Sequence, residues 1–201
     1  MENGIFFYWF SWILWIFVTF FMKKSYLRTW FACWILLCLI GSQFYIFIYH
    51  YTISLTFVIM FIGAVCLLAS QQKLIYHLFS SFTVTIGYAA LLYWEKVSPI
   101  WLVFPRILII SIIIGFIASS LASKYITRIA VCLFGVLSGE VVHGLTLDYI
   151  GLQETIGEWL FLDTLLSALL LLTFLDILQR GKTNLDLLLK NYKQNLRWQG
   201  K

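Results

Sequence analysis

Residues 159–178 read WLFLDTLLSALLLLTFLDIL, a run of twenty positions in which only Asp163 and Asp176 are charged. A helix rises about 1.5 Å per residue, so twenty residues cover the roughly 30 Å of hydrocarbon in a bilayer. A run of this length and polarity is typical of a membrane-spanning helix. This part of the chain is therefore expected to lie in a membrane.

The rest of the 201-residue chain repeats this pattern. It is 62% hydrophobic and 11% charged, whereas soluble domains are about 25% charged. Six further apolar runs are separated by charges or turn residues and cover residues 5–22, 30–49, 53–70, 74–93, 100–123 and 126–143. The sequence thus predicts an all-α, polytopic transmembrane bundle of seven spans in residues 1–182, followed by a tail of residues 183–201.

The basic residues predict the orientation of this bundle, because lysine and arginine favour cytoplasmic loops. With the N-terminus outside and the C-terminus in the cytoplasm, only Lys96 and Arg106 fall outside. The other twelve of the 14 fall inside: Lys23, Lys24, Arg28, Lys73, Lys124, Arg128, Arg180, Lys182, Lys190, Lys193, Arg197 and Lys201. The net charge of +5 is thereby explained. No nucleic-acid partner is expected, since that would need a basic face on a folded domain.

A few ionisable residues fall inside the predicted spans, where they are costly and indicate a role. Glu140 and His143 are three positions apart and share one helix face. Arg106 in the fifth run and Asp163 in the seventh are expected at a similar depth, in the outer half of the bundle. These four residues form our candidate polar core or ligand site.

Three interpretations of this site remain open. In the first, Arg106 pairs with Glu140 or Asp163 and joins the helices. In the second, the residues line a cavity open to the outside, and Glu140 binds a proton or a cation. In the third, Glu140 and His143 are metal ligands or acid–base groups, with Asp163 as a third ligand. The E-x-x-H pair occurs in helical carboxylate metal sites, but those use two such pairs, and this chain has one.

We therefore expect a non-enzymatic integral membrane protein without a cofactor. It would be an interaction or sensing component with a polar, outward-facing core between the fifth, sixth and seventh spans. The alternative is a small transporter or channel for protons or a metal cation that uses Glu140 and His143. An intramembrane enzyme is a third class, for which the sequence offers no catalytic set.

The predicted tail has the pattern of a soluble helix. Its apolar residues recur at steps of four, three and four: Leu185, Leu189, Tyr192 and Leu196. Basic residues lie among the polar positions: Lys190, Lys193 and Arg197. This pattern predicts a basic amphipathic helix that binds anionic inner-leaflet lipids. Docking on a cytoplasmic protein is the alternative.

The aromatic opening FFYWFSW at residues 6–12, the FFMKK at residues 20–24 and the small multi-span layout resemble one known family. They are similar to the YphA-type integral membrane proteins of spore-forming Gram-positive bacteria. The resemblance covers essentially the whole chain and implies a multi-pass protein of the bacterial plasma membrane. It implies no biochemical activity and carries over no site residues.

Overall fold

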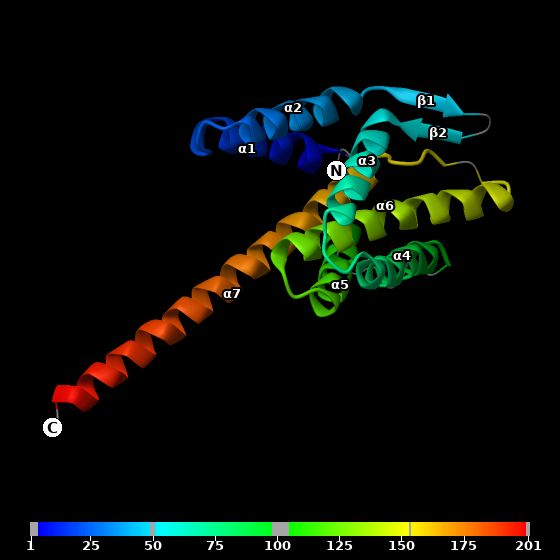
Figure 1. Cartoon of the computed structure of the whole chain (residues 1–201). Coiled ribbons are helices and arrows are strands. Elements are labelled where there is room, and N and C mark those ends of the chain that lie inside the picture. The colour runs from blue at the N-terminus through cyan, green and yellow to red at the C-terminus, as the bar shows by residue number, and fades with distance from the viewer. Residues whose placement is uncertain (1–3, 49–50, 98–104, 153, 200–201) are drawn as a thin grey trace.

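The computed structural model describes residues 4–48, 51–97, 105–152 and 154–199. Within them the chain forms seven helices and one two-stranded hairpin (Figure 1). The elements are, in chain order, α1 Ile5–Phe21, α2 Tyr26–Gly41, β1 Tyr45–Ile48, β2 Tyr51–Ser54, α3 Leu55–Ala69, α4 Leu74–Val97, α5 Arg106–Leu121, α6 Tyr125–Tyr149 and α7 Trp159–Gln199. Each helix overlaps one predicted apolar run, and the all-α prediction is confirmed.

The helices differ in whether their length suits a bilayer. Three stretches are long and apolar enough to cross one, namely Leu74–Val97, Tyr125–Tyr149 and Trp159–Thr183. The helices α1, α2, α3 and α5 have 15 to 17 residues, which at about 1.5 Å per residue is roughly 22–26 Å. A helix shorter than the roughly 30 Å hydrocarbon core crosses it only with local thinning of the bilayer or with help from its flanking residues.

The second apolar run is helical over less of its length than the sequence predicts. The helix α2 stops at Gly41, where an added Cβ would lie 3.0 Å from Oγ1 of Thr56. Beyond it, Tyr45–Ile48 pairs in antiparallel fashion with Tyr51–Ser54. These segments are rich in aromatic and β-branched residues, which favour strands. The prediction of one continuous helical span over residues 30–49 is therefore wrong.

Contacts between the elements define two ends of the bundle. At one end Lys96, near the end of α4, pairs with Glu154 in the connection after α6, and Ile156 of that connection bonds to β2. We call this the hairpin end. At the opposite end Thr127, near the start of α6, donates to Oε1 of Gln71 at 2.9 Å. We call this the tail end, because α7 continues past it (Figure 1).

Glycines on α6 set its distance from α4. An added Cβ at Gly135 would lie 2.6 Å from Cβ of Val84, and one at Gly139 would lie 2.8 Å from Cδ1 of Tyr88. Small residues allow helix backbones to approach closely where no hydrophobic force drives association, as in a membrane. The α4–α6 contact is thus the place where the bundle accommodates a large buried side chain, Tyr88, without separating the helices.

The last helix runs without a break through the predicted boundary between bundle and tail. It packs against α1, α5 and α6 and then continues to Gln199 away from the rest of the chain (Figure 1). The side chains of residue 184 and of residues 186–201 lie outside the described part. The amphipathic character of the tail, and its binding to lipid or protein, therefore stays a prediction.

Candidate functional site

Glu140 lies on the side of α6 that packs against α4. Tyr88 of α4 donates its hydroxyl to Oε2 of Glu140 at 3.1 Å. The Tyr88 side chain is 1% exposed and Glu140 is half-buried. The adjacent Gly139 permits this contact, because any larger residue there would clash with the Tyr88 ring. The Glu140 carboxylate is therefore held at a tight helix–helix contact.

His143 lies nearly one turn further along α6 and is 5% exposed. Its ring centroid is 5.2 Å from that of Tyr93 on α4. Within the described part of the chain, neither Nε2 of His143 nor the hydroxyl of Tyr93 has a hydrogen-bond partner, although both atoms are buried. Buried polar groups are nearly always hydrogen-bonded. These two neighbouring side chains therefore have unused bonding capacity.

Arg106 is the first residue of α5 and pairs with Glu95 near the end of α4. The distance from Nε of Arg106 to Oε2 of Glu95 is 2.9 Å. The N–H does not point at that oxygen, so the contact is an ion pair without hydrogen-bond geometry. Arg106 lies within electrostatic range of Glu140, but its ion-pair partner is Glu95. The predicted pairing of Arg106 with Glu140 or Asp163 is not found, because α4 supplies a nearer carboxylate.

Asp163 has a different role from the other three predicted site residues. Its side chain is 2% exposed and accepts two backbone hydrogen bonds from α1, from the amide of Gly4 at 2.8 Å and from that of Phe7 at 2.7 Å. The first amides of a helix lack intrahelical partners, and a carboxylate there is favoured by the helix dipole. Asp163 therefore caps α1 and attaches it to α7.

The connection between α6 and α7 covers the site at the hairpin end. Ile156 donates its amide to the carbonyl of Thr52 at 2.9 Å and accepts from the amide of Ser54 at 3.0 Å, so it extends the hairpin. Gly157 has φ +79°, and an added Cβ there would lie 2.6 Å from Cβ of Phe57. The side chain of Ile156 packs against α6, because an added Cβ at Gly144, next to His143, would lie 2.9 Å from Cγ1 of Ile156. We refer to residues 154–158 as the covering segment.

Two acidic residues near the covering segment have partners within the protein. Glu154 pairs with Lys96. Asp148, near the end of α6, accepts from the hydroxyl of Tyr51 at 2.8 Å. The pKa of Tyr51 is raised above its usual value of 10.0. The largest cause is this hydrogen bond to the carboxylate, and the partial burial of Tyr51 and the negative charge of Asp148 add to it. The carboxylates of Glu154 and Asp148 thus help to hold the covering segment and the hairpin in place.

The structure brings two of the four predicted residues close together, Glu140 and His143, and places Arg106 near them. Asp163 belongs to the α1 cap. Among the described residues, no group of three or more His, Cys, Asp or Glu side chains could hold a metal ion. The chemistry available at the site is that of a carboxylate bound by a phenol, an imidazole and a guanidinium, groups that exchange protons and form ion pairs.

Residues 3–198 match a family model described as YphA-like integral membrane protein. The chain belongs to this YphA-like family. The match includes the bundle and nearly the whole of the predicted tail, and it confirms the class of protein expected from the composition. No curated protein and no solved structure matches the chain.

Sequence reasoning missed two residues of the site in this YphA-like protein. Tyr88 is one of several aromatic residues in its apolar run, so its residue type alone does not single it out. The small residues Gly87 and Ala89 on either side of it are a signal of close helix packing. Glu95 falls just beyond the fourth predicted span, residues 74–93, whereas the structure includes it in α4. A short connection separates it from Arg106, and that proximity in sequence is the signal that could have identified the pair.

Proposed function

We propose that this YphA-like protein crosses the bacterial plasma membrane seven times, with its N-terminus outside and its C-terminus in the cytoplasm. The distribution of lysine and arginine supports this orientation. The contacts of Lys96 with Glu154 and of Arg106 with Glu95 support alternating helix directions, because they join the end of α4 to the end of α6 and to the start of α5. The hairpin end is then the outer end.

We further propose that the protein is a non-enzymatic sensing or interaction component, and that the covering segment responds to an external signal. One observation carries this proposal. The same short segment is bonded to the hairpin through the backbone of Ile156, and the side chain of Ile156 packs against Gly144 of α6, the neighbour of His143, where an added Cβ would lie 2.9 Å from Cγ1 of Ile156. A partner that displaces the segment would release contacts at the surface and beside the polar site together.

The attachment of the covering segment is suited to reversible movement. The ion pair of Lys96 with Glu154 is exposed, with 45% and 40% of the two side chains accessible, and exposed ion pairs contribute only about 0–1 kcal/mol. The other attachments are a few hydrogen bonds, among them the one between the hydroxyls of Thr52 and Thr155 at 2.9 Å, and the buried side chain of Ile156, which is 4% exposed. Segments that move are drawn from weakly held parts of a structure, and here the polar attachments are weak while Ile156 anchors the segment.

Hydrogen exchange of the full chain in lipid nanodiscs tests this proposal. In a Lys96→Gln/Glu154→Gln variant we expect faster exchange in residues 154–158 and a changed rate at the far end of α6, which would transmit the signal. Changing the exposed pair Lys23 and Lys24 to glutamine serves as the control and is expected to leave both regions unaltered. If faster exchange stays confined to residues 154–158, the sensing role is rejected.

A second candidate function is proton or metal-cation transport by Glu140 and His143. Nε2 of His143 has no hydrogen-bond partner among the described residues and lies about one turn from a carboxylate, which favours this alternative. The test is pH-dependent and metal-dependent flux into proteoliposomes for the native protein and for Glu140→Gln. A flux that disappears in the variant, while the protein remains folded, would replace the sensing role by transport. An absence of flux in the native protein would reject transport.

A further inference from the structure

A cavity of about 880 Å³ opens at the tail end, between the α3–α4 turn, the α5–α6 turn and α7. Its lining includes three cationic side chains, Lys73, Lys124 and Arg180, and among the described residues that line it there is no aspartate or glutamate. Pockets for small ligands are typically about 300–1,000 Å³. The cavity is at the opposite end from Glu140 and His143, so it is a separate feature.

Two of the lysines stand directly before helices. Lys73, with φ +62°, precedes α4, and Lys124 precedes α6. The first turn of α6 has no side-chain cap. Unpaired amides at a helix start carry the positive partial charge of the helix dipole. Here this charge adds to that of the lysines at the cavity, and such a combination favours an anion.

Positive charge around the cavity exceeds the negative charge available from the described side chains. Arg180 pairs with Asp176 at 2.6 Å. Arg128 is 9% exposed, but its partners are neutral: its Nε donates to the carbonyl of Ala122 at 2.7 Å and its Nη1 to Oε1 of Gln179 at 3.0 Å. Buried charges usually have a counter-charge. Arg128 directly follows Thr127 of the cavity lining, so it adds positive charge beside the cavity without lining it.

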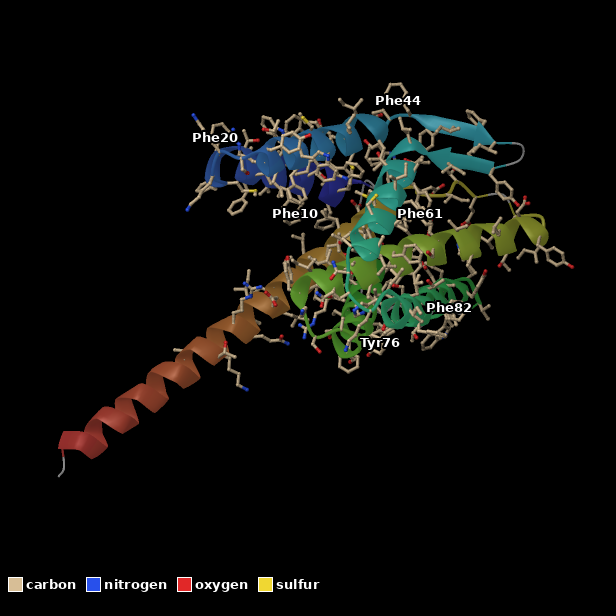
Figure 2. All side chains as sticks on the ribbon, viewed as in Figure 1. Phe10, Phe20, Phe44, Phe61, Tyr76 and Phe82 are labelled. Carbon is tan, nitrogen blue, oxygen red and sulfur yellow. The ribbon has the colours of Figure 1, made fainter. Side chains whose placement is uncertain are left out.

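The walls of the cavity are already held in position. The hydroxyl of Tyr76, labelled in Figure 2, donates to the carbonyl of Leu121 at 3.2 Å and joins α4 to the end of α5. Thr127 on α6 bonds to Gln71 in the α3–α4 turn at 2.9 Å. Both bonds connect elements that contribute to the lining. A ligand would therefore find a largely formed site and would not have to order it.

We propose that this cavity binds a phosphate group, supplied by an anionic phospholipid or by a soluble phosphate compound. Because α4 and α6 begin at the cavity, it lies at the level where spanning helices meet lipid headgroups. Basic pockets between helices at this level recognise anionic headgroups. The site is distinct from the predicted binding of lipid by the tail, since Lys73 and Lys124 belong to turns of the bundle.

The test measures binding of phosphatidylglycerol and of phosphatidylcholine to the full chain in a neutral detergent by native mass spectrometry. A lysine near the membrane surface contributes about 1 kcal/mol to anionic-lipid binding, or roughly fivefold. We therefore expect Lys73→Gln/Lys124→Gln to bind phosphatidylglycerol about 25-fold more weakly. The control Lys23→Gln/Lys24→Gln removes the same charge from exposed positions and is expected to change binding less than twofold.

Competition by inorganic phosphate distinguishes the two sources of the group. Displacement of the lipid at millimolar phosphate assigns the site to soluble phosphate compounds, and lack of displacement assigns it to the headgroup. Equal weakening in both double variants, or equal binding of the two lipids by the native protein, overturns the proposal. If the cavity variant loses its circular dichroism, Arg180→Gln replaces it, since that side chain is 68% exposed. An unchanged affinity in that variant would then count against the site.

Discussion

The attachment of α1 to the bundle through Asp163 gives the sharpest prediction about stability. Replacing Asp163 by alanine leaves the amides of Gly4 and Phe7 without their acceptor at a buried position. Replacing it by asparagine keeps one acceptor oxygen but removes the charge and turns an NH₂ group toward the other amide. The alanine variant should therefore be the less stable of the two.

The size of the effect follows from the two hydrogen bonds. Each bond to a charged group contributes about 1.5–3 kcal/mol in a water-soluble protein. Values in membrane proteins are lower, about 0.6 kcal/mol on average for interhelical bonds, because the unfolded chain also finds partners there. For Asp163→Ala we expect a loss of about 2–4 kcal/mol in the free energy of unfolding, and for Asp163→Asn about half of that.

Two measurements in detergent micelles test this expectation. Unfolding by sodium dodecyl sulfate, followed by tryptophan fluorescence, gives the change in global stability. Hydrogen exchange at residues 4–8 gives a local readout, since these amides should exchange faster once the cap is lost. The matched control is Asp148→Asn, because an asparagine oxygen still accepts from Tyr51; its effect should stay below about 1 kcal/mol. If Asp163→Ala unfolds at the same detergent concentration as the native protein and residues 4–8 exchange no faster, the capping role is refuted.

Two further predictions concern the hairpin end. A double-mutant cycle between Arg106 and Glu95 should give a coupling energy of at least about 0.5 kcal/mol. The cycle between Arg106 and Glu140 should give a smaller coupling energy. If the second coupling energy is the larger one, the assigned pairing of Arg106 with Glu95 is wrong. The raised pKa of Tyr51 means that its protonated form is favoured in the folded protein, so its contribution to stability is complete below pH 10.0 and is lost as the pH rises through its folded-state pKa. Ultraviolet titration of tyrosinate should show this residue titrating later than in an Asp148→Asn variant, and an unchanged titration would contradict the assignment.

Hydropathy was sufficient to predict the helices but not the hairpin. Each helix overlaps an apolar run, because intrasegment hydrogen bonds satisfy the backbone in lipid. Tyr45–Ile48 lies in the second predicted span and Tyr51–Ser54 at the break before the third. A short apolar run does not reveal whether it is helix or strand. What distinguishes them is the close approach of Gly41 to Thr56, a contact between two different elements that no local pattern contains.

The candidate site shows the same limit for side chains. The positions of Glu140 and His143 on one face follow from helix geometry, so their proximity could be predicted. The partners of Asp163 could not be predicted, because they are the backbone amides of Gly4 and Phe7. These amides lie 159 and 156 positions before Asp163 in the chain. Amides at a helix start have no sequence signature beyond the helix itself, and here Gly4 offers no side-chain cap of its own.

The two ends of the bundle differ in whether their basic residues have carboxylate partners, and this difference connects the orientation to the proposed phosphate site. At the hairpin end the basic residues Lys96 and Arg106 each have a carboxylate partner within the chain. At the tail end Lys73 and Lys124 have none among the described side chains, and Arg128 binds neutral groups. Cations left without internal partners at a membrane boundary are balanced by anions from outside the protein, and phosphate groups are the ones a bilayer supplies. The excess of lysine and arginine that directs insertion would thus also define a binding site once the helices have packed.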